Sequence, residues 1–478
     1  MAESSRENET CWDAPPSPPS AGLNLGFLVG VLKERRALRR HERWSRATIA
    51  AHQGAALAEI RRFATDRSPF YRRFHAGCES RPLLELPILT KGQLMESFDE
   101  LVTDPAVKLV DVREFLAALD GFRLFRDQYA VTQTSGSTGS PGIFLANRSE
   151  WTTVIASYAR AQEWAGIHAD LLRRTRIGVV SSRIPWHQSA LVGMSVDSPF
   201  LPVRRFDATS PITEIVAGLN RWQPENLVCY ASMGHALAEE QLAGRLHIHP
   251  QAVMCSSEVL TAKSRQRIHE AFAVEPFNVY AATESAGIAS ECERHRMHLY
   301  EDLVITEVVD DGNRPVPVGV VGAKLLVTVL FSRTQPLIRY EMSDTISVSN
   351  LWCECGRGFR LLEAIAGRAE DVLTLPATGA NAVRIHPNVF HQLLDSLAIR
   401  QWQVEQTTEG LVIHIVPGTT AVNQSSLVAD LMRQLQAAGA SSIPIHVDLI
   451  DAIAKTALGK APLIKALRGA PADDRQSS

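Results

Sequence analysis

The amino-acid sequence predicts an α/β protein in which a large N-terminal domain is followed by a small C-terminal α+β domain. The chain has 478 residues, which is long enough for more than one domain. From Val131 onward, apolar runs of strand length alternate with helical stretches, a pattern typical of sheets covered by helices. Near residue 370 the alternation gives way to a compact unit of roughly a hundred residues, a common size for one domain.

The first part of the chain is predicted to be helical after a disordered start. Residues 1–20 are polar and rich in Pro and Ser, and they lack the basic start and apolar core of a signal peptide. A helix is expected from Leu25 to about Ala64. Its arginines suggest a nucleic-acid surface, but glutamates are interleaved with them, which favours a solvated helix face. Thr90 is placed to cap a helix that runs to about Leu101.

The remaining helices and strands are predicted from the spacing of apolar residues, which repeats about every 3.6 residues in a helix and every second residue in a strand. Strands are expected at Ile177–Val180, Leu227–Cys229, Ala252–Cys255, Asn278–Ala281, Leu303–Val309, Ala323–Leu330 and Thr345–Val348, with helices at Glu150–Ala165, Ile212–Arg221 and Ala262–Phe272. The C-terminal unit is expected to contain helices Val389–Leu397 and Ser425–Ala438, strands Leu411–Val416 and Ile443–Leu449, and a loose tail at 469–478.

Composition and charge exclude several classes of function. The net charge of -3 gives no general attraction to nucleic acid or to an anionic membrane. The apolar run Leu23–Leu32 is too short to span a bilayer. Seven cysteines, an odd and low number for a chain of this size, favour a reducing cytoplasmic setting. The sequence leaves the oligomeric state open.

The segment Thr132–Gly142 reads Thr-Gln-Thr-Ser-Gly-Ser-Thr-Gly-Ser-Pro-Gly. Glycines let the backbone approach an anion, and hydroxyls and backbone N–H groups can then donate to phosphate oxygens. The segment is not a Walker A loop, because no Gly-Lys-Ser/Thr follows. A flexible surface turn is the alternative interpretation.

Five motifs in order give this chain a resemblance to the adenylate-forming superfamily, and within it to the phenylacetate–CoA ligase-like branch. They are the loop at 134–139, Tyr280-Ala-Ala-Thr-Glu284, Arg339-Tyr-Glu-Met-Ser-Asp344, Gly367-Arg-Ala-Glu-Asp371 and Lys455-Thr-Ala-Leu-Gly-Lys460. The branch is indicated by Ser68–Arg72, Leu86–Leu94, Ala289–Cys292 and Pro336–Tyr340. The resemblance implies an ATP- and acyl-binding domain over 21–369 and a small mobile domain over 370–468.

The resemblance implies that the protein joins a carboxylic acid to AMP, releases pyrophosphate, and passes the acyl group to the thiol of CoA. It assigns ATP binding to Thr134, Ser135, Gly136, Ser137, Thr138, Gly139, Ser257, Glu258, Tyr280, Asp344 and Arg368. Thr283 and Glu284 are suited to the α-phosphate and to Mg²⁺, since carboxylate oxygen is a ligand that Mg²⁺ prefers.

Lys460 is the expected catalytic cation, because a lysine after Gly459 can reach a bound anion as a compact charge. The resemblance gives it a role only in the first half-reaction, with Glu370 as the hinge on which the C-terminal domain turns. Lys455 is a nearby rival that the motif alignment disfavours.

A second set of residues suits zinc. Cys292 and His298, together with Cys353 and Cys355, can supply a tetrahedral Cys₃His site. Some members of the branch carry zinc at matching positions. His295 is an alternative to His298, Cys255 is a remote candidate, and idle buried cysteines are the alternative for the set as a whole.

The sequence also departs from the family pattern. Ser140 and Gly142 stand where many members carry a phosphate-loop lysine, and Leu375–Val383 is expected to be irregular where a CoA-binding glycine turn is common. The acyl pocket is expected at Tyr230, Ser232, Ala281 and Ala282, a lining that suits a flat aryl acid. Transfer to an amine, a hydroxyl or a carrier-protein thiol is the alternative to CoA. A non-catalytic ligand-binding protein is the third interpretation.

Overall fold

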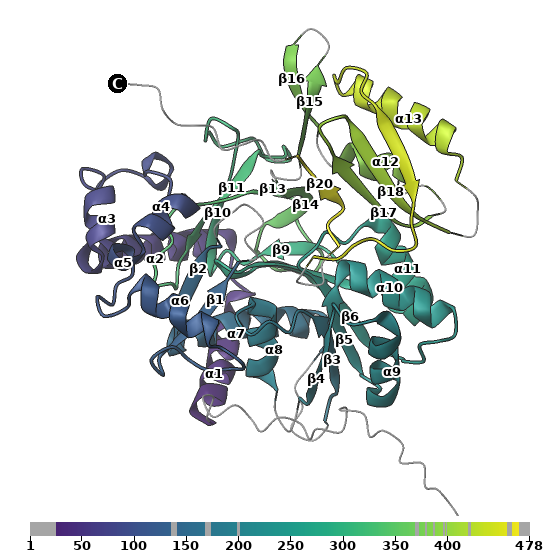
Figure 1. The fold of residues 1–478 in the computed structure, drawn as a ribbon. Coiled ribbons are helices and arrows are strands. Elements are labelled where there is room, and N and C mark those ends of the chain that lie inside the picture. Colours follow the sequence, from purple (N-terminus) through teal and green to yellow (C-terminus); the bar gives the residue numbers. More distant parts are fainter. Residues whose placement is uncertain are drawn as a thin grey trace, which may run out of the picture.

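The computed structural model describes residues 25–134, 141–167, 174–197, 201–368, 372–377, 380–385, 388–394, 397, 399–418, 422–456 and 461–467. Over these ranges the chain forms a large lobe of sheets and helices and a smaller lobe that begins after residue 371 (Figure 1). The predicted fold class, a large α/β part with a small α+β C-terminal part, is therefore confirmed.

A nine-stranded sheet organises the large lobe, in the order β13-β14-β9-β8-β7-β6-β5-β3-β4. The strands are β3 Ile177–Ser181, β4 Val203–Asp207, β5 Asn226–Tyr230, β6 Ala252–Ser256, β7 Phe277–Ala282, β8 Ala286–Glu291, β9 Met297–Leu299, β13 Asp344–Ser349 and β14 Leu361–Arg368. Strands β3 to β7 pair in parallel, and β7, β8, β9, β14 and β13 pair antiparallel. The carboxyl ends of the parallel strands share one edge, which is where open α/β sheets bind ligands.

Helices pack on this sheet and begin where the sequence provides caps. They are α7 Arg148–Trp164, α8 Gln188–Val196, α9 Ile212–Trp222, α10 Ala231–Leu242 and α11 Ala262–Phe272. Asn147 and Glu150 form a capping box at the start of α7, and the Thr261 hydroxyl accepts from the backbone of Ser264 at the start of α11. Such caps satisfy N–H groups that a helix leaves without a partner.

The N-terminal helices differ from the prediction in two respects. They are α1 Leu25–His41, α2 Arg46–Arg67, α3 Pro69–Phe74, α4 Lys91–Glu96, α5 Phe98–Leu101 and α6 Leu109–Ala117, with a 3-10 turn at Leu83–Glu85. The helix that Thr90 caps ends at Glu96, and Ser97 separates it from α5, so it does not run unbroken to Leu101. The single helix expected from Leu25 to Ala64 is wrong, because it breaks before Ser45, whose side chain caps α2. The Trp44 ring stacks on His41 at 3.8 Å and holds the corner.

The arginines of α1 are only partly on a solvated face. Arg39 is 59% exposed, as expected, and pairs with Glu163. Arg35 is 4% exposed and forms ion pairs with Glu42 at 2.8 Å and Glu163 at 2.6 Å. The arginine cluster therefore anchors α1 to α7 through Glu163.

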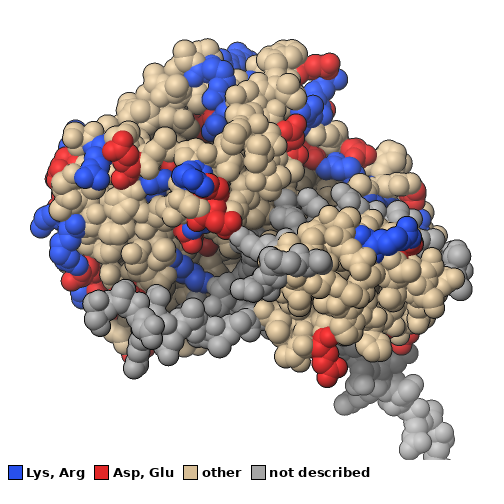
Figure 2. Space-filling model, turned by 90° about the horizontal axis from the view of Figure 1, so that it is seen from above, with Lys and Arg blue, Asp and Glu red and all other residues tan. Residues whose placement is uncertain are grey.

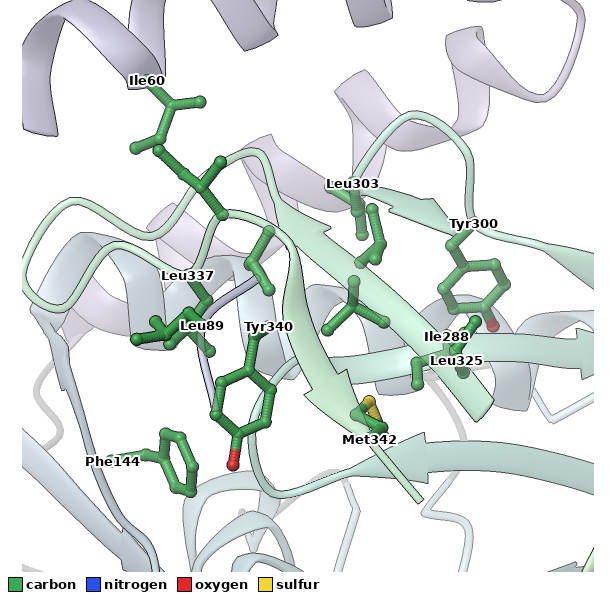
Figure 3. Close-up of a cluster of buried hydrophobic side chains, with 14 of the residues drawn as sticks. Ile60, Leu89, Phe144, Ile288, Tyr300, Leu303, Leu325, Leu337, Tyr340 and Met342 are labelled. Carbon is green, nitrogen blue, oxygen red and sulfur yellow. The ribbon is translucent and has the colours of Figure 1, made fainter. Parts of the chain in front are cut away.

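Two smaller sheets complete the large lobe. β1 Tyr129–Gln133 and β2 Ile143–Asn147 form a hairpin, and β10 Val304–Val309, β11 Lys324–Val329 and β12 Tyr340–Met342 form a three-stranded sheet. Figure 3 shows part of the core between these elements, with the Tyr340 ring beside Leu89 and Phe144. The Phe144 and Tyr340 rings meet edge-on with centroids 6.0 Å apart.

The small lobe has its own sheet and core. The four-stranded sheet runs β19-β18-β17-β20, beside a β15-β16 hairpin. The elements are β15 Leu373–Ala377, β16 Ala380–Ile385, α12 Asn388–Leu394, β17 Ile399–Gln406, β18 Leu411–Pro417, α13 Gln424–Ala437, β19 Ile445–Leu449 and β20 Ile464–Lys465. The segment Leu375–Val383, expected to be irregular, lies in the hairpin over its described residues, and β17 was not predicted.

The surface has no strongly polarised face in the view of Figure 2, where Lys and Arg side chains alternate with Asp and Glu. Across the described residues, no helix is long and apolar enough to cross a membrane.

Candidate active site

The Tyr280 to Glu284 motif lies at the end of β7, the last parallel strand before the sheet turns antiparallel. Tyr280 is 8% exposed, and Ala281, Ala282, Thr283 and Glu284 are half-buried. A tight turn, in which the Ser285 N–H donates to the Ala282 carbonyl at 3.3 Å, returns the chain to β8. Thr283 and Glu284 thus stand at the ligand-binding edge of the sheet.

Glu284 lies near enough to Tyr340 for its negative charge to raise the pKa of that residue. Burial raises the pKa of Tyr340, and the negative charges of Glu284 and Glu341 raise it further. Tyr340 belongs to the Arg-Tyr motif, whose last member is Asp344. The structure therefore brings the second and third of the predicted motifs together.

The third and fourth motifs meet on neighbouring strands. Asp344 begins β13, Arg368 ends β14, and their Cα atoms are directly opposed in the antiparallel register. The side chain of Arg368 and the hinge residue Glu370 lie outside what the structure describes.

The phosphate loop leaves and returns through the β1–β2 hairpin. Thr134 closes its base, because its N–H donates to the Gly142 carbonyl at 2.9 Å and its hydroxyl accepts from the Gly142 N–H at 2.8 Å. The carbonyl of Trp186 accepts from the Gln133 N–H at 3.0 Å. The predicted ligands Ser135, Gly136, Ser137, Thr138 and Gly139 lie outside the described residues.

A lysine that the sequence analysis did not single out lies beside this loop. A Cβ added at Gly142 would be 2.9 Å from the Phe144 ring and 3.5 Å from the Lys91 side chain. Lys91 is the first residue of α4, which the Thr90–Gln93 capping box holds in place. The motif Leu-Thr-Lys in Leu86–Leu94 could have revealed it, but that stretch was used only for the helix cap at Thr90 and for the family resemblance.

The branch motifs form the support beneath Tyr340. The Tyr71 hydroxyl donates to the Pro336 carbonyl at 2.8 Å and accepts from the Ile338 N–H at 3.2 Å. The Leu89 N–H donates to the Arg339 carbonyl at 3.1 Å, and the Leu89 carbonyl accepts from the Glu341 N–H at 2.9 Å. These backbone contacts fix the strand that carries Tyr340.

Arg339 itself is structural. It is 3% exposed, its backbone has φ of 50°, and its guanidinium pairs with Glu307 at 3.0 Å and donates to the Leu86 carbonyl. Burial raises the pKa of Glu307 despite this arginine. The buried pair locks the segment before Tyr340 onto β10.

Ser257 and Glu258 follow β6 at the same edge. Ser257 has φ of 67°, in the left-handed region. The Glu258 carboxylate accepts from the Ser232 N–H at 2.8 Å and from the Ala461 N–H at 3.2 Å. A contact from the small lobe therefore reaches the residues predicted to bind ATP.

The C-terminal motif lies against this edge through its described flanks. Lys460 itself lies outside the described residues, and Ala461 directly follows it. The Lys455 ammonium donates to the Ala208 carbonyl at 2.9 Å and contacts Met233 Sδ at 3.2 Å. Burial lowers the pKa of Lys455. Lys455, the rival lysine, thus serves as an anchor to the large lobe.

The expected acyl-pocket residues lie on β5, α10 and β7. Tyr230 is 1% exposed, and its hydroxyl accepts from the Ser182 N–H at 2.9 Å. Burial raises its pKa. Tyr230 is therefore a fixed side chain of the core, and Ser232 is half-buried on α10.

The four predicted zinc ligands come together from three segments. The potential ligand atoms of Cys292, His298, Cys353 and Cys355 all lie within 4.8 Å of one another. The Nε2 atom of His298 is 3.2 Å from Cys355 Sγ, and its Nδ1 is 3.1 Å from the Phe359 carbonyl. A second hydrogen bond of this kind orients the ring of a metal-binding histidine.

The alternative zinc ligands, His295 and Cys255, have other partners in the structure. His295 packs on the Phe277 ring at 4.4 Å, and its Nδ1 is 3.3 Å from Glu291. Cys255 pairs in register with Cys229 between β6 and β5. Neither belongs to the Cys292 cluster.

Comparisons with known proteins agree with this architecture. No family model matches the chain. It is 27% identical over 385 residues to a phenylacetate–coenzyme A ligase of Thermus thermophilus, covering 76% of this chain and 80% of that protein. It is 22% identical over 384 residues to Protein CapK of Staphylococcus aureus, covering 79% and 78% respectively.

The similar solved structures include one enzyme in several states. The chain matches 2-hydroxyisobutyryl-CoA ligase in its postadenylation state with a TM-score of 0.71, 21% identity and coverage of 90% and 92% of the two chains. The thioesterification state of that enzyme, with CoA, matches with a TM-score of 0.55, 21% identity and coverage of 90% and 91%. In sequence and in fold, the predicted resemblance of this chain to the adenylate-forming superfamily is therefore confirmed.

Proposed function

We propose that this protein is an AMP-forming acid–thiol ligase. It activates a carboxylic acid with ATP, releases pyrophosphate, and transfers the acyl group from acyl-AMP to the thiol of CoA. The observation that carries the proposal is the convergence of Glu284 with Tyr340, of Asp344 with Arg368, and of the C-terminal segment with Glu258. Relatives named as CoA ligases, and a solved relative bound to an acyl-AMP and CoA, support the same reaction.

The residues divide the work of the first step. Glu284 supplies a carboxylate for Mg²⁺, and Thr283 a hydroxyl for the α-phosphate. Tyr280 offers a flat face to adenine, and Asp344 accepts from the ribose hydroxyls with Arg368 beside it. Together these groups hold the α-phosphate for attack by the carboxylate, and bound Mg²⁺ would neutralise charge that develops there.

The loop at 134–139 and Lys91 bind the β- and γ-phosphates of ATP. The loop at 134–139 has no lysine of its own, and a Cβ at Gly142 would meet the Phe144 ring at 2.9 Å and the Lys91 side chain at 3.5 Å. Lys91 therefore supplies a cation from α4 at the return of the loop. A lysine acts on phosphate as a compact point charge.

The second step needs a different placement of the small lobe. We place the domain boundary at the hinge residue Glu370, with residues 21–369 on one side and 370–468 on the other. Lys460 completes the first site and leaves it for the second. The higher TM-score against the postadenylation state than against the thioesterification state supports an arrangement of the lobes like that of the postadenylation state.

An aryl acid is the proposed substrate class. Tyr230 offers an aromatic ring held in place by its hydroxyl, and the small residues Ala281 and Ala282 are half-buried beside Tyr280, a combination that suits a flat acid. Purified protein incubated with ATP, Mg²⁺, CoA and a panel of aryl, hydroxy and fatty acids tests this. We expect AMP and an aryl-CoA thioester. Formation of ADP, or a clear preference for fatty acids, would contradict the proposal.

The acceptor is tested by leaving CoA out. We expect the acyl-AMP to accumulate and no stable product to form. A stable amide or ester formed with an added amine or alcohol would favour the alternative acceptor. The cysteine composition leads us to place this chemistry in the cytoplasm.

We also propose a structural zinc ion at Cys292, His298, Cys353 and Cys355. Three thiolates and one imidazole nitrogen are the donor set of closed structural zinc sites. The spacing of the ligand atoms and the bond from His298 to Phe359 fit such an ion. The ion would tie the loop after β8 to the segment between β13 and β14, remote from Lys460 in sequence.

A further inference from the structure

One carboxylate of the large lobe holds backbone from both lobes. Glu258 follows β6 in a turn whose left-handed residue is Ser257. One oxygen accepts from the Ser232 N–H at 2.8 Å, and the other accepts from the Ala461 N–H at 3.2 Å. Both N–H groups donate to a charged acceptor, which makes each bond stronger than a neutral one.

The bond to Ser232 fixes the carboxylate in the large lobe. Ser232 lies in the first turn of α10, and Tyr230, which precedes that helix, provides no side-chain cap. The first N–H groups of a helix need acceptors, and a negative charge there is favoured by the helix dipole. Glu258 supplies an acceptor and a negative charge at the start of α10. Its bond to Ser232 therefore fixes the position of the second carboxylate oxygen, whether or not the small lobe is in contact.

The bond to Ala461 fixes the chain at the residue that follows Lys460. Six residues before Ala461, Lys455 is anchored to the Ala208 carbonyl. The described chain on either side of residues 457–460 is therefore tied to the large lobe, at Lys455 and at Ala461. The only other described lysine that ties the lobes through its ammonium is Lys263, which donates to the carbonyls of Leu397 and Ile399, far from Ala461 in sequence.

We propose that Glu258 is a positioning residue for the first half-reaction, which holds the Lys460 segment in place through Ala461, and that it is not a nucleotide contact. This inference rests on the proposed function and departs from the ATP-binding role expected for Glu258 from sequence. The bond to Ala461 has to break when the small lobe turns, so Glu258 contributes to adenylation and not to acyl transfer.

The test measures the two half-reactions separately in Glu258→Gln and Glu258→Ala. We expect kcat of acid-dependent ATP–pyrophosphate exchange to fall about tenfold or more, as for loss of a hydrogen bond to a charged group. The KM for ATP should stay within about twofold of the wild-type value, and transfer from synthetic acyl-AMP to CoA should persist. A raised KM for ATP with unchanged kcat would identify a nucleotide contact and overturn the proposal. Equal loss in both half-reactions would also overturn it.

Hydrogen–deuterium exchange of residues 461–467 provides a readout that does not depend on activity. We expect faster exchange of this segment in Glu258→Gln than in the wild type, with unchanged thermal stability. Lys263→Met is the matched control, since it removes a tie between the lobes without touching Ala461. Equal exchange rates at residues 461–467 in Glu258→Gln and in the wild type would contradict the proposal that Glu258 holds this segment. Because this measurement uses no substrate, its result stands even where the proposed reaction fails.

Discussion

Asp344 and Arg368 lie directly opposite each other on β13 and β14, the antiparallel strands at one end of the nine-stranded sheet. Twenty-three residues of chain separate them, and the loop between carries two of the predicted zinc ligands. The sheet register thus places one acidic and one basic residue of separate motifs side by side. We assign both to the nucleotide.

Removing the acidic member should weaken ATP binding. In Asp344→Ala we expect the KM for ATP to rise about tenfold or more, because an acceptor for the ribose hydroxyls is lost. Steady-state kinetics at saturating acid measure this. Asp66→Ala, an exposed change on α2, is the control. An unchanged KM for ATP in Asp344→Ala would argue against the ribose assignment.

Lys91 should act on the phosphates of ATP and not on the nucleoside. Lys91→Met is expected to lower the affinity for ATP and pyrophosphate while affinity for AMP stays unchanged, since AMP lacks the β- and γ-phosphates. Isothermal titration with each ligand compares them. Lys108→Met, which alters an exposed lysine 3.8 Å from Asp99, is the control. Equal weakening of ATP and AMP would mean that Lys91 only supports the fold of α4.

The zinc proposal predicts metal content and stability together. Metal analysis of the purified protein should give about one zinc per chain, the stoichiometry of one closed four-ligand site. Cys353→Ser should lose the metal and unfold at a lower temperature. Cys78→Ser, at a buried cysteine outside the cluster, should keep the metal. A wild-type protein without zinc, or a Cys353→Ser variant with full zinc content, would refute the site.

A buried ion pair should dominate the stability of the contact between α7 and the loop after β9. Arg160 and Asp302 are 0% and 3% exposed and share two hydrogen bonds of 2.9 Å and 2.6 Å. Arg160→Met leaves the Asp302 carboxylate buried, with His41 Nδ1 at 2.9 Å as its other ion-pair partner among the described residues, so we expect a loss of about 3–5 kcal/mol in the free energy of unfolding. Chemical denaturation measures it. A change below about 1 kcal/mol, as for a surface pair, would show that water reaches Asp302.

The motifs predicted part of the site because each one keeps its chemistry in a short stretch of chain. The Cys292, His298, Cys353 and Cys355 cluster was identified from local patterns, and the fold brings its potential ligand atoms within 4.8 Å of one another. The roles of Glu284 and Asp344 stay predictions. Lys91 and the second contact of Glu258 were not foreseen. Both depend on contacts between segments far apart in sequence, and local patterns carry no information about such contacts.

The errors in the predicted secondary structure have the same cause, since they arise where contacts within the fold override the local sequence pattern. Helix periodicity continues through residues 42–45, and the break arises from the cap at Ser45 and the stacking of Trp44 on His41. Strand β17 was missed because its sequence, Ile-Arg-Gln-Trp-Gln-Val-Glu-Gln, is largely polar and becomes a strand through pairing with β18 and β20. Tertiary pairing overrides weak local preference in such segments.

The central claim is that the protein adenylates an acid with help from Lys460. ATP–pyrophosphate exchange, measured with and without an aryl acid in the wild type and in Lys460→Ala, tests it most directly. We predict exchange that requires the acid and falls by orders of magnitude in Lys460→Ala, since a charge aimed at the transition state is lost. Absence of acid-dependent exchange in the wild type, across the whole acid panel, would contradict the account.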